Sequence, residues 1–152
     1  MEPLQNLIIN TCFGFFFGIM IYFKYQGILI SKLDHILAAL AILISIIILF
    51  FRSIEALDLA HFLYCLIYLF TVSFLSNNVY LLGLNVIMIT VILATRYYYQ
   101  HCLINKKHES KGFFADINSL VIKNLKFWNW DYIFPILLVV SIYQLINYIS
   151  IK

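Results

Sequence analysis

Polar residues recur at every third position in one short stretch of an otherwise apolar sequence. Arg52, Glu55, Asp58 and His61 lie between two long apolar runs. Residues three apart are neighbours on a helix surface, which allows Arg52 to pair with Glu55, and Asp58 with His61. Because a carboxylate beside a histidine can bind or transfer a proton, Asp58 and His61 are the first candidate catalytic residues.

A structural role explains the same four residues. A carboxylate at the centre of a membrane helix costs roughly 2.5 to 3.5 kcal/mol on insertion scales. Asp58 is therefore expected at the membrane edge, as the N-cap of the following helix, where the helix dipole favours an acid. We favour this charged connection between two helices over a site that handles protons or binds a ligand.

A second polar group, Arg96, His101 and Cys102, follows the fourth apolar run. If the third and fourth helices form a tight hairpin, this group lies at the level of His61. The candidate catalytic set would then be Asp58, His61, Arg96 and His101, with Cys102 as a further member.

Signatures of cofactors are weak. The three cysteines are widely spaced and include no CxxC pair, so neither a disulfide framework nor a zinc module is indicated. A membrane haem would need histidines that face each other across helices, and only His61 falls inside an expected span. We expect no cofactor or metal, and the sequence has no channel filter or glycine-rich phosphate motif.

Composition sets the class of protein. Hydrophobic residues make up 64% of the chain and charged residues 11%, with a mean hydropathy of +0.95. Soluble domains contain about 25% charged residues, so we expect most of this chain to lie in lipid. A net charge of +3 with scattered lysines and arginines argues against nucleic-acid binding.

Apolar runs predict an all-α integral membrane protein, a small bundle of about five transmembrane helices forming one domain over residues 1–152. The expected spans are 7–23, 36–51, 59–75, 79–95 and 133–151. The connection 96–132 should contain an amphipathic helix, 113–128, lying in the interface plane with its lysines toward headgroups.

Several residues are expected to contact lipid or other helices. Gly14 and Gly18 form a GxxxG pair, which lets another helix approach closely. Amphipathic aromatic rings favour the headgroup level, so membrane anchors are expected at Tyr97, Tyr98, Tyr99, Trp128 and Trp130. In the third span, His61, Tyr64, Cys65 and Tyr68 share one face, which should point at other helices rather than lipid.

Lysine and arginine counts predict the orientation. The connection 96–132 contains more of them than any other, which places it and the N-terminus on the cytoplasm-equivalent side. Lys24 and Lys32, at the opposite end, argue against this orientation. The sequence does not indicate which membrane is involved.

Elimination then favours a non-catalytic accessory or structural subunit, whose partners are the lipid bilayer and other membrane proteins or further copies of itself. One alternative is a small membrane enzyme or a redox or proton-handling protein, with its site at the inner face. Another is a transporter component, although few polar residues line the spans.

Overall fold

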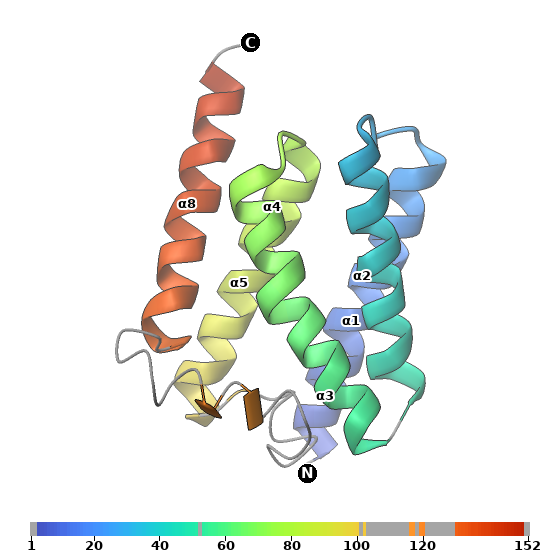
Figure 1. The fold of residues 1–152 in the computed structure, drawn as a ribbon, viewed down its shortest axis with the longest axis vertical. Helices are drawn as coiled ribbons and strands as arrows, with labels where there is room; N and C mark the ends of the chain where they lie inside the picture. Colours follow the sequence, from blue (N-terminus) through green and yellow to red (C-terminus); the bar gives the residue numbers. More distant parts are fainter. Residues whose placement is uncertain are drawn as a thin grey trace.

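The structure, a computed structural model, describes residues 3–51, 53–100, 102, 116–117, 119–120 and 130–150. Its regular elements are all helical within these ranges. They are α1 (Pro3–Tyr25), α2 (Lys32–Phe50), α3 (Ile54–Phe62), the π-helix η1 (Leu63–Tyr68), α4 (Leu69–Leu75), α5 (Val79–Tyr99) and α8 (Trp130–Ser150). Since α3, η1 and α4 follow one another directly, they form one continuous rod (Figure 1).

Five helices in the described part of the chain are long and apolar enough to cross a membrane: Pro3–Tyr25, Lys32–Phe50, Ile54–Leu75, Val79–Tyr99 and Trp130–Ser150. The all-α membrane fold is therefore confirmed, and the helices are those of an integral multi-pass membrane protein. Each expected span overlaps one of these five helices. All of them except α5 begin three to five residues before the expected span.

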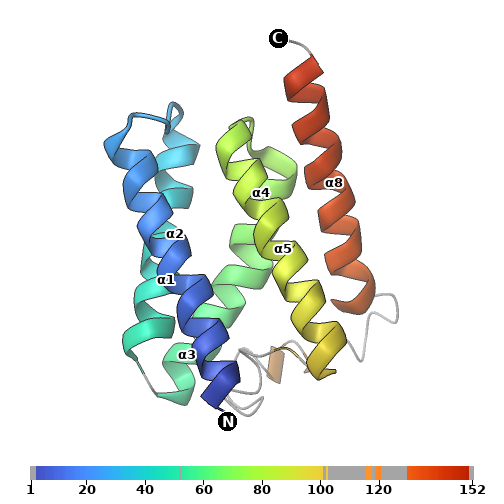
Figure 2. The same ribbon diagram turned by 180° about the vertical axis from the view of Figure 1, so that it is seen from behind.

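The chain runs up and down, so its two termini lie at opposite ends of the bundle (Figures 1 and 2). The N-terminal end holds the connection 51–53 and the last turn of α5. The C-terminal end holds the connection 26–31 and the turn 76–78. The α1–α2 hairpin lies on one side and α8 on the other, with the α3–η1–α4 rod between them. Helix α8 packs on α4 and α5.

Polar side chains cap three of the helices. Ser31 and Asp34 form a capping box at the start of α2. Asn78 caps α5 by accepting hydrogen bonds from the amides of Tyr80 and Leu81. Ser53 caps α3, with its hydroxyl accepting from the Ala56 amide at 3.2 Å.

The expected N-cap role of Asp58 is wrong. Helix α3 begins at Ile54, which places Asp58 in its second turn, and the Asp58 side chain is buried, with 3% exposed. Ser53 takes the capping role because its small hydroxyl, directly before the first turn of α3, can accept from the first free amides of the helix. Glu55 is instead the acid in the first turn, where it is exposed.

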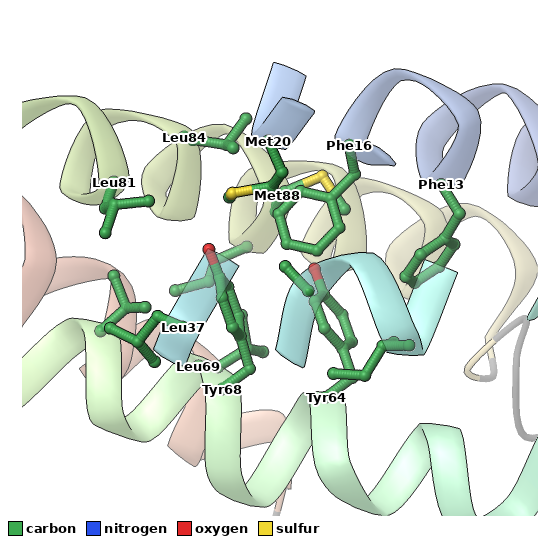
Figure 3. Close-up of a cluster of buried hydrophobic side chains, with 14 of the residues drawn as sticks. Phe13, Phe16, Met20, Leu37, Tyr64, Tyr68, Leu69, Leu81, Leu84 and Met88 are labelled. Atoms are coloured by element: carbon green, nitrogen blue, oxygen red, sulfur yellow. The ribbon is translucent and has the colours of Figure 1, made fainter. Parts of the chain in front are cut away.

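A buried aromatic cluster joins α1 to the rod (Figure 3). Phe13 lies edge-on to Tyr64 with 5.2 Å between ring centroids, and Phe16 lies edge-on to Tyr68 at the same distance. Such pairs contribute about 0.5 to 1.5 kcal/mol beyond their buried area. Tyr64, Cys65 and Tyr68 are buried and His61 is half-buried, which confirms that their shared face points at other helices.

Two polar networks, one at the C-terminal end of the bundle and one near its middle, hold elements together. Asp34 Oδ2 accepts hydrogen bonds from the Ile30 and Ser31 amides, both at 3.1 Å, and from Asn78 Nδ2 at 3.0 Å. This ties the connection 26–31 to the turn 76–78.

In the second network, Asn85 of α5 donates to Ser73 of α4 at 2.9 Å and to Ser141 of α8 at 3.0 Å, and Ser141 donates to Ser73 at 2.9 Å. All three residues are fully buried. Hydrogen bonds of this kind help to hold helices together in lipid, where hydrophobic attraction between helices is weak.

The predicted interfacial helix 113–128 falls largely outside the described residues. Of its length, positions 116, 117, 119 and 120 are described and helical. Among the expected membrane anchors, Tyr97 and Tyr98 are 84% and 77% exposed. Trp130 stacks on Phe134 with 5.2 Å between ring centroids, Tyr99 is half-buried, and Trp128 lies outside the described residues.

Candidate functional site

The third span changes its winding next to the candidate residues. After Phe62 the α-helix becomes the π-helix η1, which contains Tyr64 and Cys65. A π-turn holds more residues per turn than an α-helix, so it alters which side chains share a face. Such turns are frequent at functional sites, and this one directly follows Asp58 and His61.

His61 is the centre of a polar cluster at the N-terminal end of the bundle. Its Nε2 atom lies 3.5 Å from the sulfur of Cys102, which follows α5 in the chain. The Cys65 thiol, one turn along the same rod, also interacts with the His61 ring. Asp58 and Arg96 both lie within electrostatic range of that ring. The Asp58 carboxylate favours a positive charge on the ring, whereas the Arg96 guanidinium opposes it.

A cleft of about 50 Å³ lies beside this cluster. Its lining residues come from α1, α5 and η1, together with Cys102; Figure 2 shows α1 and α5 on the same face of the bundle. The lining is mostly apolar and includes Cys12, Phe13, Tyr64, Met88, Thr95 and Cys102. The cleft is a half-open indentation, so its contents would also contact the surroundings of the bundle.

Tyr64 lines the cleft and carries a buried hydroxyl. Only 1% of this side chain is exposed, and its oxygen has no hydrogen-bond partner among the described residues. Figure 3 shows the Tyr64 and Tyr68 hydroxyls pointing away from their own helix into the bundle. The Tyr64 hydroxyl lies within electrostatic range of the Cys12, Cys65 and Cys102 thiols. A buried hydroxyl without a partner costs about 1 to 3 kcal/mol, which a bound acceptor would relieve.

Arg96 belongs to the cleft and also to the contact between α5 and α8. It forms an ion pair with Asp131 at the start of α8, and its guanidinium carbon lies 5.7 Å from the centroid of the Phe134 ring. The Asp131 side chain is largely exposed. Exposed ion pairs contribute at most about 1 kcal/mol, so this one positions α8 more than it stabilises the bundle.

The structure brings together part of the predicted catalytic set. Asp58, His61, Arg96 and Cys102 meet at the N-terminal end, whereas His101 and Arg52 lie outside the described residues. Whether these residues catalyse a reaction stays a prediction.

The convergence of the three cysteines was not predicted from the sequence. Cys12 and Cys102 line the same cleft, and Cys65 lies against His61, yet their spacing along the chain shows no pattern. Within the described ranges, no group of three or more histidine, cysteine or acidic side chains has the geometry of a metal site. The arrangement offers a nucleophile, a base and a hydrogen-bond donor, and this combination is suited to reactions of a thiol.

The GxxxG pair has no close neighbour among the described residues. A Cβ atom added at Gly14 or Gly18 would have no described atom within 4 Å, and Gly18 is exposed on the outer face of α1.

No protein-family model matches the sequence, and neither a curated protein nor a solved structure matches it.

Proposed function

We propose that this protein is an accessory or structural membrane subunit that uses the outer face of α1 to pack against a transmembrane helix of a partner subunit. The observation that carries the proposal is the open space at Gly14 and Gly18, which lie four residues apart on a helix that could span the membrane. Glycines at this spacing allow two helix backbones to approach closely, and van der Waals contact then drives association in lipid. The interior of the bundle supports this role, since α1, α2, the rod, α5 and α8 all contribute buried side chains to one core.

Replacing Gly18 with isoleucine tests the proposal. A Cβ atom added at Gly18 has no described atom within 4 Å and the residue is exposed, so the fold should persist while close helix approach is blocked. Native gel electrophoresis of native membrane extracts should show the Gly18→Ile variant outside the assembly that contains the unaltered protein. Gly83→Ile on α5 is the matched control, because its Cβ position is equally open, and it should remain in the assembly. Equal behaviour of the two variants would contradict a role for this face.

We also infer that the N-terminal end of the bundle faces the cytoplasm-equivalent side. The support is the excess of lysine and arginine in the connection 96–132, which starts at that end. Glycosylation tags at the two termini should be modified only at the C-terminus. Modification at the N-terminus alone would reverse the orientation.

A second candidate function, a small membrane enzyme, is favoured by the contact between His61 and Cys102. A neutral imidazole beside a thiol accepts its proton and yields the nucleophilic thiolate. Alkylation of the purified protein by iodoacetamide at neutral pH should therefore modify Cys102 faster than Cys12, which is also half-buried and lines the same cleft. Equal rates at the two cysteines would remove the support for this candidate.

A further inference from the structure

Three features of the cleft are suited to forming a thioester on a cysteine. Cys102 supplies a thiol at the cleft, and His61 Nε2 lies 3.5 Å from its sulfur. Tyr64 supplies a buried hydroxyl without a partner among the described residues. The remaining lining is largely apolar side chains of α1 and α5, and the cleft is partly open to its surroundings.

We propose that Cys102 is a self-acylation site that takes a long-chain fatty acyl group from an acyl-coenzyme A as a thioester. The beginning of the acyl chain would lie in the cleft between α1 and α5, and the rest would extend into the bilayer. This proposal rests on the reactive Cys102 of the second candidate function and adds the class of substrate.

The reaction balances with groups that the structure and the substrate provide. His61 Nε2 takes the proton from the Cys102 thiol, and the sulfur attacks the carbonyl carbon of the acyl-coenzyme A. The Tyr64 hydroxyl donates a hydrogen bond to the carbonyl oxygen, on which negative charge develops. The bond between the carbonyl carbon and the coenzyme A sulfur then breaks, and the proton on His61 passes to the departing thiolate. No oxidation or reduction occurs, and one thioester replaces another.

The size and position of the cleft favour an acyl chain over a small soluble ligand. A volume of about 50 Å³ holds only a short piece of a molecule, so the occupant must continue outside it. An apolar chain meets lipid there at no cost, whereas a polar molecule would lose its water. Cys102 is also close in sequence to the exposed Tyr97 and Tyr98, whose rings are typical of the headgroup level, where the head of an acyl-coenzyme A can stay in water.

The test uses the full chain in lipid nanodiscs, which expose both faces and make the result independent of orientation. Incubation with palmitoyl-coenzyme A should attach one palmitoyl group to the Cys102 peptide, seen by mass spectrometry and released by neutral hydroxylamine. Cys102→Ser should abolish labelling, whereas the matched variants Cys12→Ser and Cys65→Ser should keep it. Labelling at Cys12 or Cys65 in the unaltered protein would overturn the proposal.

Two further variants separate chemistry from structure. Tyr64→Phe removes a hydroxyl without a described partner and keeps the ring, so it should fold normally and acylate about a hundredfold more slowly. His61→Gln should also be about a hundredfold slower at neutral pH, and its deficit should shrink as rising pH ionises the thiol without a base. Unchanged rates in both variants would contradict the proposed site. If Cys102 reacts rapidly with iodoacetamide but never with palmitoyl-coenzyme A, the acyl proposal fails while the reactive thiol stands.

Discussion

At the C-terminal end of the bundle, Asp34 accepts three hydrogen bonds and Asn78 joins two connections that are far apart in the sequence. At the N-terminal end, the buried Tyr64 hydroxyl and Gln5 Oε1 have no partner among the described residues. In lipid no water is present to form a hydrogen bond with a polar group that lacks a protein partner, so each such group lowers the stability of the fold. The difference teaches that the buried polar groups of the C-terminal end tie connections together, whereas buried groups of the N-terminal end keep unused hydrogen-bonding capacity among the described residues.

The middle of the bundle contains both buried polar groups with partners and buried polar groups without them. Ser73, Asn85 and Ser141 bond to one another across three helices, although Asn85 Oδ1 has no partner among the described residues. The Tyr68 hydroxyl, about one turn before Ser73 along the rod, also has no hydrogen-bond partner among the described residues. The change from satisfied to unsatisfied groups therefore takes place along the α3–η1–α4 rod, near the end of the π-helix.

Removing Asp34 should have the largest effect on stability. Asp34→Ala leaves the Ile30 and Ser31 amides and the Asn78 amide group without their acceptor, which should lower the free energy of unfolding by about 3 kcal/mol. Thermal unfolding in detergent micelles, followed by circular dichroism, measures the change. Glu55→Ala is the control, because Glu55 is an exposed acid in a first helical turn, and it should change stability by less than about 0.5 kcal/mol. Similar losses in both variants would show that the Asp34 bonds contribute little.

Breaking the three-helix network should have an intermediate effect. Asn85→Ala removes two bonds between helices, each worth about 0.6 kcal/mol on average in membranes, so the expected loss is about 1 kcal/mol. Thr90→Ala on the same helix is the control, since Thr90 is exposed and donates only to Val86 of its own helix. The same unfolding assay applies. A loss no larger than that of Thr90→Ala would mean that the network does not hold α8 in place.

The smallest effect on stability is expected from Tyr68→Phe. Whether this substitution raises or lowers the free energy of unfolding is what distinguishes the two cases. Removing a buried hydroxyl that has no described partner should leave stability unchanged or raise it by up to about 1 kcal/mol. The ring would keep its edge contact with Phe16. A clear loss of stability in the unfolding assay would show that the hydroxyl does form a hydrogen bond. Tyr68 would then no longer count among the unsatisfied polar groups.

Most of the fold could be predicted from the sequence because long apolar runs determine transmembrane helices almost alone. The helix starts could not be placed as well, since Ser31 and Ser53 extend α2 and α3 beyond their apolar residues. The predicted N-cap at Asp58 was wrong for that reason.

Only part of the candidate site could be predicted from the sequence. Periodicity identified the face with His61 and Tyr64, but no local pattern shows that the rod becomes a π-helix there or that Cys12 approaches Cys102. The Asp34–Asn78 bond is likewise a product of packing between two connections. Contacts of this kind depend on how the helices are arranged, which a single sequence does not show.

The contrast between the two ends is tested most directly by measuring stability and Cys102 alkylation together in two variants, Asp34→Ala and His61→Gln. The account predicts that Asp34→Ala lowers the unfolding temperature and leaves the alkylation rate of the folded protein unchanged. His61→Gln should slow alkylation of Cys102 at neutral pH while the unfolding temperature stays close to that of the unaltered protein. If His61→Gln instead unfolds as readily as Asp34→Ala and alkylates at the normal rate, His61 is a structural residue and the account is contradicted.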